Sequence, residues 1–205
     1  MGGLFSIENP VWRFVNKLLH VLLLNVLWIV CSLPLFTMGA ATTAVYYVTL
    51  KMVRDEEGYT IKSFFDAFKT NFKQATAIWL ILVVIGAFIG ADLTVYMRSS
   101  SISIFGMILM AAFFAVAVIY IFEHIYVFSL LARFDNTVWG TMKNAFLMSI
   151  RHLPYSILMV ASNVILTAIG FLAFPPILLF GLPLMAFVNS LFLVKIFDRY
   201  QIKED

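Results

Sequence analysis

The chain has 205 residues, of which 62% are hydrophobic and only 12% are charged, against roughly 25% charged in an ordinary soluble domain. With a mean hydropathy of +0.97, this composition excludes a soluble enzyme and indicates an integral membrane protein. A net charge of +3 is too small to indicate a nucleic-acid partner, and one cysteine, Cys31, excludes a disulfide framework. The length suits about six spans of some 20 residues, so we expect a single all-α membrane domain over residues 1–205.

The first span is predicted over about residues 14–33 and the second over about 38–53, with a tight turn between them. Pro34 should end the first helix, because proline lacks a backbone donor and disfavours helix at the preceding residue. Thr37 then offers a hydroxyl that can cap the start of the second helix.

The second span begins with a wall of small residues. In a bilayer, helices associate through close packing and hydrogen bonding, and small residues at four-residue spacing supply both. The spaced pairs are Gly39 with Thr43 and Ala40 with Ala44. We therefore predict that the second helix is the one on which the others pack, or that its small face binds a partner.

An amphipathic helix is predicted next, over about residues 60–74, lying in the cytoplasmic membrane interface. Its apolar face carries phenylalanines at helical spacing, namely Phe64, Phe65, Phe68 and Phe72. The opposite face carries Lys62, Lys69 and Lys73. Interfacial anchoring and docking of a partner protein both fit this pattern.

The third span is predicted over about residues 75–97, with Gly86 and Gly90 forming a GxxxG pair that favours close helix contact. The fourth helix begins near Ile102 and has no breaker before Phe134. At 1.5 Å per residue this helix is nearly 50 Å long, so only about residues 102–124 should span the hydrocarbon.

A second interfacial helix is predicted over about residues 137–151, followed by spans over about 154–174 and 177–197. In the last span, Gly181 and Pro183 should bend or break the helix. The freed carbonyl either lines a cavity, as in transporter half-helices, or marks a simple kink. The hexapeptides AFKTNF and TMKNAF have a Lys and a Phe at the same positions, so an internal repeat in the chain stays an alternative.

The basic residues predict the orientation. With both termini in the cytoplasm, 13 of the 14 Lys and Arg residues fall on the inner side, and only Arg98 falls outside. We therefore expect six spans in a bacterial plasma membrane, with the N-terminus and the C-terminus cytoplasmic.

Polar residues inside the spans are the candidate functional residues, because lipid offers them no partner. Asn25, Asn163 and Asn189 each fall near the middle of a span, where they either hydrogen-bond between helices or form a midplane pathway for a solute. Asp92 and Glu123 fall near span ends, where solvation in the interface or a proton relay would explain them.

Enzymatic motifs are absent from the sequence. We find no HExxH, no GxSxG and no Walker loop, and the three histidines lie far apart. These observations predict a protein that is not an enzyme, that binds no metal or cofactor, and that cannot power transport by itself.

Several strings together resemble the YesL family, an uncharacterised group of bacterial membrane proteins. They are Asn25 with Leu27 and Trp28, then SLPLFTMGAATTA from Ser32, the phenylalanine-rich segment with NFKQ, LARF before Asp135, and His152 with Leu153 and Pro154. Members of the family are encoded beside carbohydrate importers and polysaccharide-degrading enzymes, so the resemblance implies a role in oligosaccharide uptake. It carries over no catalytic or binding residue.

The expected function is therefore that of an accessory subunit or assembly factor of a carbohydrate ABC importer. The expected partners are the lipid bilayer and the importer's permease subunits. The alternatives are an autonomous small-solute channel or secondary transporter that uses the midplane Asn residues, and a membrane-embedded sensor. The sequence leaves the oligomeric state and the sugar open.

Overall fold

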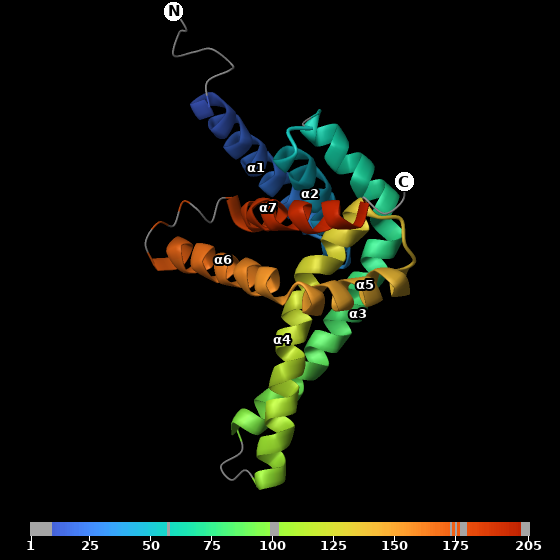
Figure 1. Cartoon of the computed structure of the whole chain (residues 1–205), viewed down its shortest axis with the longest axis vertical. Helices are drawn as coiled ribbons and strands as arrows, with labels where there is room; N and C mark the ends of the chain where they lie inside the picture. Colours follow the sequence, from blue (N-terminus) through green and yellow to red (C-terminus); the bar gives the residue numbers. More distant parts are fainter. Residues whose placement is uncertain are drawn as a thin grey trace, which may run out of the picture.

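The structure, a computed structural model, describes residues 10–56, 58–98, 103–172, 174, 176 and 180–201. Regular structure in these ranges is helical, which agrees with the predicted all-α class (Figure 1). The elements are α1 (Pro10–Ser32), the 3-10 turn η1 (Leu35–Thr37), α2 (Met38–Val53), α3 (Thr60–Arg98), α4 (Ile104–Arg133), α5 (Val138–Arg151), α6 (Leu153–Leu172) and α7 (Gly181–Gln201).

Helix α2 forms the centre of the bundle. Twelve of its 16 residues are buried, and it packs against α1, α3, α4 and α7. Helix α3 approaches α2 closely at Gly39, where a Cβ atom would meet the Ala75 carbonyl oxygen and lie 2.6 Å from Trp79 Cβ. Only a residue without a side chain lets α2 and α3 come this close.

The turn between α1 and α2 differs from the prediction in one detail. Thr37 does not cap α2 with its side chain, and its hydroxyl donates instead to the carbonyls of Cys31 and Pro34. The reason is that η1 runs directly into α2, so that the Met38 N–H already bonds to the Leu35 carbonyl. The hydroxyl is therefore free to tie the turn back to the end of α1.

The predicted interfacial helix over residues 60–74 and the predicted span over 75–97 are one continuous helix, α3, with 39 residues. The connecting residues, KQATA, contain neither Gly nor Pro, so nothing interrupts the backbone hydrogen bonds between the two segments. The phenylalanine-rich segment is therefore the first part of α3.

A long apolar arm projects from the rest of the molecule (Figure 1). It consists of residues 80–98 of α3 and 104–120 of α4, and we call it the distal hairpin. The Trp79 indole N–H donates to the Leu35 carbonyl over 2.9 Å, so the turn between α1 and α2 lies against α3 at the point where the distal hairpin begins. From there α3 continues for about 28 Å, which is close to the thickness of a bilayer's hydrocarbon core.

The C-terminal helices lie across the direction of the distal hairpin, with α6 beside α7 (Figure 1). The predicted bend or break at Gly181 and Pro183 stays a prediction, because α7 begins at Gly181 and residues 177–179 lie outside those that the structure describes. Pro183 lies in the first turn, where a backbone N–H has no partner within the helix in any case. Gly181 has a φ of +43°, a conformation that glycine adopts readily.

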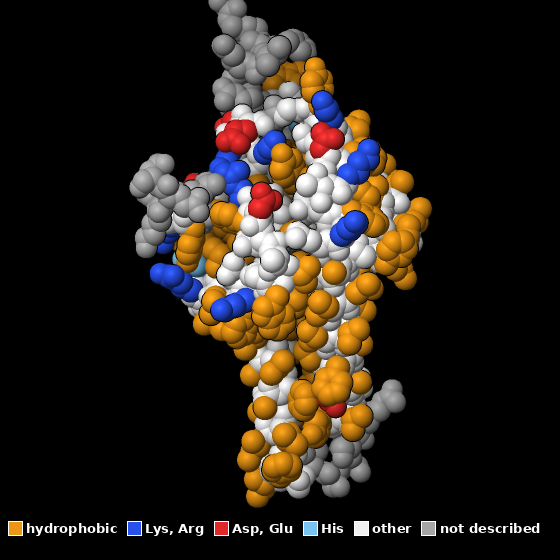
Figure 2. Space-filling view, turned by 90° about the vertical axis from the view of Figure 1, so that its right-hand side faces the viewer, with side chains coloured by type: hydrophobic (Ala, Val, Ile, Leu, Met, Phe, Trp, Pro, Cys, Tyr) orange, Lys and Arg blue, Asp and Glu red, His pale blue; other side chains and the backbone are white. Residues whose placement is uncertain are grey.

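Five described helices are long and apolar enough to cross a membrane, namely α1, α3, α4, α6 and α7. With 16 residues, α2 is shorter than these, so the count of six spans stays a prediction, as does the cytoplasmic location of both termini. Charged side chains gather on the body of the molecule, whereas apolar side chains dominate the distal hairpin on the face in Figure 2.

Candidate functional site

The small residues of α2 face other helices of the same chain. Ala40, Thr43 and Ala44 are fully buried, and Thr43 donates to the Gly39 carbonyl over 2.9 Å. Trp28 of α1 closes the same region by donating to the Thr42 hydroxyl over 3.1 Å. This wall therefore packs the bundle internally, while Pro34 stays exposed in the turn.

The two glycines of the GxxxG pair in α3 have different surroundings. Gly86 faces α4, where an added Cβ would lie 2.7 Å from the Tyr120 hydroxyl oxygen. That hydroxyl donates to the Leu82 carbonyl over 2.9 Å, which joins α4 to α3 at the base of the distal hairpin. Gly90 lies farther out and has open space around it. Only Gly86 takes part in packing within the chain.

The phenylalanines at the start of α3 form a cluster of ring contacts, of which one is stacked and two are edge-on. Phe64 is fully buried, and its ring lies 5.5 Å from that of Phe65 and 6.2 Å from that of Phe68. Phe68 in turn contacts Phe72 at 5.5 Å. Phe65 stays 37% exposed, so part of the cluster remains on the surface.

Asn189 lies in a buried polar seam between α7 and α2. Its amide donates to the Tyr46 hydroxyl over 3.2 Å, and one residue on, Ser190 bonds to Thr49 over 2.9 Å. Sequence reasoning identified Asn189 and missed the other three residues. Their signal was the spacing of three between Tyr46 and Thr49, which places both on one face of α2.

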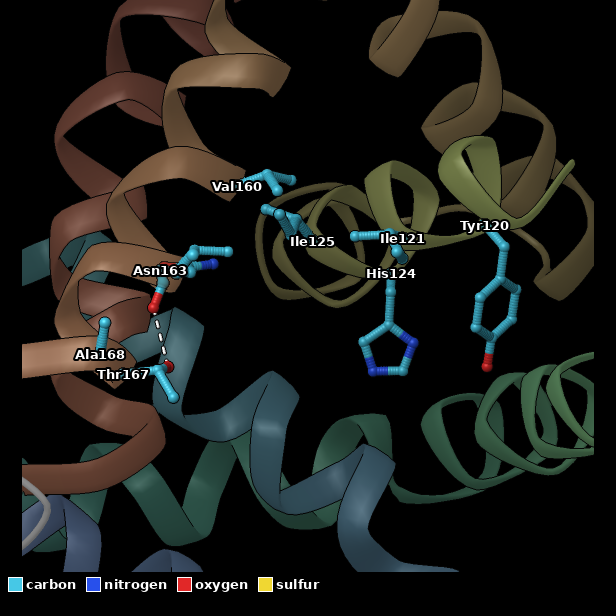
Figure 3. A pocket seen from close by; sticks show the side chains of 9 residues that line it. Tyr120, Ile121, His124, Ile125, Val160, Asn163, Thr167 and Ala168 are labelled. Carbon is cyan, nitrogen blue, oxygen red and sulfur yellow. Dashed lines mark hydrogen bonds between the residues drawn. The ribbon is translucent and has the colours of Figure 1, made fainter. Parts of the chain in front are cut away.

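Asn25 and Asn163 lie at other helix contacts. The Asn25 amide oxygen would lie 2.7 Å from a Cβ added to Gly181, which places Asn25 between α1 and the start of α7. Asn163 lies on α6 and faces α4 (Figure 3). The three asparagines therefore belong to three different pairs of helices.

A pocket of about 640 Å³ separates α4 from α6 around Asn163 (Figure 3). Its α4 wall is formed by Tyr120, Ile121, His124 and Ile125, and its α6 wall by Val160, Asn163, Val164, Thr167 and Ala168. Within the part of the chain that the structure describes, Asn163 Oδ1 and His124 Nδ1 are buried without a hydrogen-bond partner.

The acidic candidates do not join the pocket. Asp92 lies in the distal hairpin, and its Oδ2 is buried without a partner among the described residues. Arg98, the basic residue predicted to lie on the outer side, has a side chain outside those that the structure describes. Glu123 precedes His124 on α4 and is half-buried.

Charged side chains form ion pairs at the C-terminal end of α2. Lys17 pairs with Asp55 over 2.8 Å, and Arg54 pairs with Asp198 of α7. Nearby, the His152 ring bonds to the Tyr200 hydroxyl over 2.9 Å. Burial lowers the pKa of His152, and the guanidinium groups of Arg199 and Arg151 lower it further.

The described residues contain no group of three or more His, Cys, Asp or Glu side chains that could hold a metal ion. The asparagines described above lie at contacts between helices, and Asn163 also lines an open pocket. The expectations that the protein is not an enzyme and that it uses no cofactor stay predictions.

The chain shares sequence similarity with known families and proteins. A family model described as "Protein of unknown function, DUF624" matches residues 21–93, a segment that contains α2 and most of α3. The chain is 25% identical over 163 residues to "Uncharacterized protein YesL" of Bacillus subtilis (strain 168), covering 78% of this chain and 76% of that protein. It is 26% identical over 166 residues to "Uncharacterized protein YteU" of the same organism, covering 75% and 70%. No solved structure matches. These matches confirm the resemblance to the YesL family.

Proposed function

We propose that this protein is a non-enzymatic accessory subunit or assembly factor of a bacterial carbohydrate ABC importer, and that it binds the importer's permease through the distal hairpin. The resemblance to the YesL family supports the link to oligosaccharide uptake. The choice of the distal hairpin as the binding surface follows from how little of it the chain itself covers.

The observation that carries this choice is the exposure of large apolar side chains along the hairpin. Phe88 is 65% exposed, Phe105 is 69% exposed and Phe114 is 64% exposed. In α4, buried residues begin only at Ile125. A face that the chain itself leaves uncovered is available to a second membrane protein, and helices in lipid associate through van der Waals packing and hydrogen bonds.

A photo-crosslinking experiment tests the proposal in the native membrane. Phe88 is replaced by benzoylphenylalanine, the cells are irradiated, and adducts are identified by mass spectrometry after affinity purification in mild detergent. We expect an adduct with an importer permease, and we expect the permease to copurify in stoichiometric amounts without irradiation.

Leu19 of α1 provides the matched control, because it is also apolar and is 56% exposed but lies outside the hairpin. The same replacement there should give no permease adduct. Lipid adducts alone at Phe88, together with purification of the protein by itself, would contradict the proposal.

The alternative function is an autonomous small-solute channel or secondary transporter with a polar midplane pathway. The pocket around Asn163 is the observation in its favour, because an amide and an imidazole from two helices lie beside one open space. Against it, most of the pocket wall is aliphatic, and Asn25 and Asn189 lie elsewhere. Solute flux into liposomes that contain only this protein would support the alternative.

A further inference from the structure

The burial pattern of α5 is the reverse of that expected for a helix on the surface of a soluble protein. Its inner face packs against α3, α4 and α6 and carries small or polar side chains, of which Thr141, Ala145 and Ser149 are fully buried. Its outer face carries large apolar side chains, of which Trp139 is 75% exposed and Leu147 is 51% exposed. Such a face indicates contact with a membrane or another apolar surface.

Two basic side chains stand among the apolar residues of this outer face. Lys143 and Arg151 are both exposed, and neither forms an ion pair with the described residues. The Arg151 guanidinium packs over the Tyr200 ring at 5.7 Å, a contact that leaves its charge uncompensated. The sequence contains no Asp or Glu between Asp135 and Asp198. The outer face of α5 therefore combines positive charge with apolar surface and has no acidic residue of its own.

Hydrogen bonds at both ends hold α5 at one level above the distal hairpin. Just before α5, the Asn136 carbonyl accepts a hydrogen bond from the Gln74 side chain of α3 over 2.9 Å. At the other end, the Ser156 hydroxyl contacts the Tyr126 hydroxyl of α4 over 3.1 Å and the Ser149 carbonyl of α5 over 2.8 Å. Along their helices, Gln74 and Tyr126 each lie about 9 Å from the hairpin. Helix α5 consequently lies across the direction of the hairpin (Figure 1).

This level corresponds to the headgroup layer of a membrane that the hairpin spans. The headgroup layer extends about 5–8 Å beyond the hydrocarbon on each side. With side chains, a helix has a radius of about 5–6 Å, so the side of α5 nearer the hairpin reaches into that layer. On the face in Figure 2, Lys and Arg side chains lie on the body and none is visible on the hairpin, as this placement requires.

We propose that the outer face of α5 binds anionic phospholipid headgroups, whose phosphates Lys143 and Arg151 hold. Ammonium and guanidinium groups are the side chains that bind phosphate best. Trp139 and Phe146 then contact the upper part of the acyl chains, in the interfacial layer where tryptophan is enriched in membrane proteins. The inference requires the hairpin to lie in the hydrocarbon, but it is independent of the importer proposal.

Photoreactive lipids test this surface in the purified full-length protein. The protein is placed in phosphatidylcholine nanodiscs that contain an equal small fraction of either a phosphatidylglycerol or a phosphatidylcholine probe, each with a diazirine near the glycerol. Labelled peptides are quantified by mass spectrometry. We expect the phosphatidylglycerol probe to label residues 139–151 at least about fivefold more strongly, because attraction to an anionic surface is worth about fivefold per basic residue. High salt should reduce this preference.

Two lysine substitutions separate α5 from the rest of the basic surface. Lys143→Gln should lower the preference for the phosphatidylglycerol probe about fivefold. Lys62→Gln is the matched control, because Lys62 is also exposed but lies at the start of α3, about 27 Å along the helix from the hairpin. This control should leave the preference unchanged. Labelling of the hairpin by the phosphatidylcholine probe should be the same in both variants, which checks that they are folded and inserted.

Three results would overturn the proposal. Equal labelling of α5 by the two probes would mean that its outer face does not select anionic lipid. Failure of both probes to label α5 would mean that protein covers this face or that it lies outside the headgroup layer. An equal loss of preference in K62Q and K143Q would mean that the charge of the whole protein, rather than α5, attracts the lipid.

Discussion

Helix α2 and the distal hairpin are both apolar, yet they have opposite surroundings. In α2, twelve of 16 residues are buried, and small side chains such as Gly39 and Ala40 let α3 approach. In the hairpin, large side chains such as Phe88 and Phe105 stand mostly exposed. Both regions are apolar, and side-chain size separates the one that packs within this chain from the one that this chain leaves uncovered.

The largest expected effect comes from adding a side chain to α2. In Gly39→Leu, the new Cβ would meet the Ala75 carbonyl oxygen and lie 2.6 Å from Trp79 Cβ, so α2 and α3 have to separate. Overpacking usually costs about 1–3 kcal/mol, and because backbone must move here we expect a loss at or above that limit. Size-exclusion chromatography in mild detergent should show loss of the monodisperse protein.

Gly90→Leu is the matched change in the distal hairpin. Nothing lies near the position where its Cβ would be, so the variant should remain as stable as the wild type or gain up to about 1 kcal/mol from better helix propensity. If G90L failed as severely as G39L, the hairpin would be packed like α2 and the contrast would be lost.

A charge in the hairpin tests whether it lies in lipid. Phe114 is 64% exposed on α4, and Phe114→Arg should raise the free energy of membrane insertion by about 2.5–3.5 kcal/mol. Carbonate extraction of membranes should therefore release much of the variant. Trp139→Arg in α5, at a residue that is 75% exposed, is the control and should stay integrated, because α5 is predicted to lie in the interface. Equal extraction of the two variants would place the hairpin outside the hydrocarbon.

A smaller effect is expected in the polar seam of α2 and α7. Asn189→Leu removes the donor to the Tyr46 hydroxyl, and Tyr46→Phe removes the acceptor. Interhelical hydrogen bonds in membranes contribute about 0.6 kcal/mol on average and up to about 1.7. A double-mutant cycle of thermal unfolding should give a coupling in that range, whereas strictly additive losses would mean that the bond contributes nothing.

The smallest expected effect is a pH dependence at the charged end of the body. The folded pKa of His152 is lowered below the ordinary value of 6.5, so the folded protein binds fewer protons than the unfolded chain between those two values. Stability should be complete above about pH 6.5 and should decline as the pH falls below it. Melting temperatures at about pH 7.5 and about pH 5.5 should differ less in His152→Gln than in the wild type.

Much of the fold followed from the sequence where local chemistry decides it. The end of α1 next to Pro34, the unbroken α4 and the bounds of α5 agree with the predictions within a few residues. The interfacial segment over residues 60–74 and the span over residues 75–97 are parts of one helix, α3, because amphipathicity changes along it while its backbone continues. A change in the pattern of apolar residues along a helix does not mean that the helix ends.

The candidate site was less accessible to sequence reasoning. Asn163 was singled out for its depth in a span, but its neighbours His124 and Tyr120 come from α4, about 40 residues earlier. Pairing of α4 with α6 depends on how the whole bundle packs, which no local pattern encodes. The same holds for the meeting of Trp79 with Leu35, which sets where the distal hairpin begins.

The bond between Thr49 and Ser190 joins residues that are 141 positions apart in the chain. At synthesis rates of about 5–20 residues per second, Thr49 is made about 7–28 s before its partner on α7. During that interval the Thr49 hydroxyl can bond only locally, as it also does in the finished protein through the Tyr46 carbonyl at 3.2 Å. Helix α2 is therefore made early, but its bond to α7 forms only after α7 has been made. Until then the packing around α2 stays incomplete.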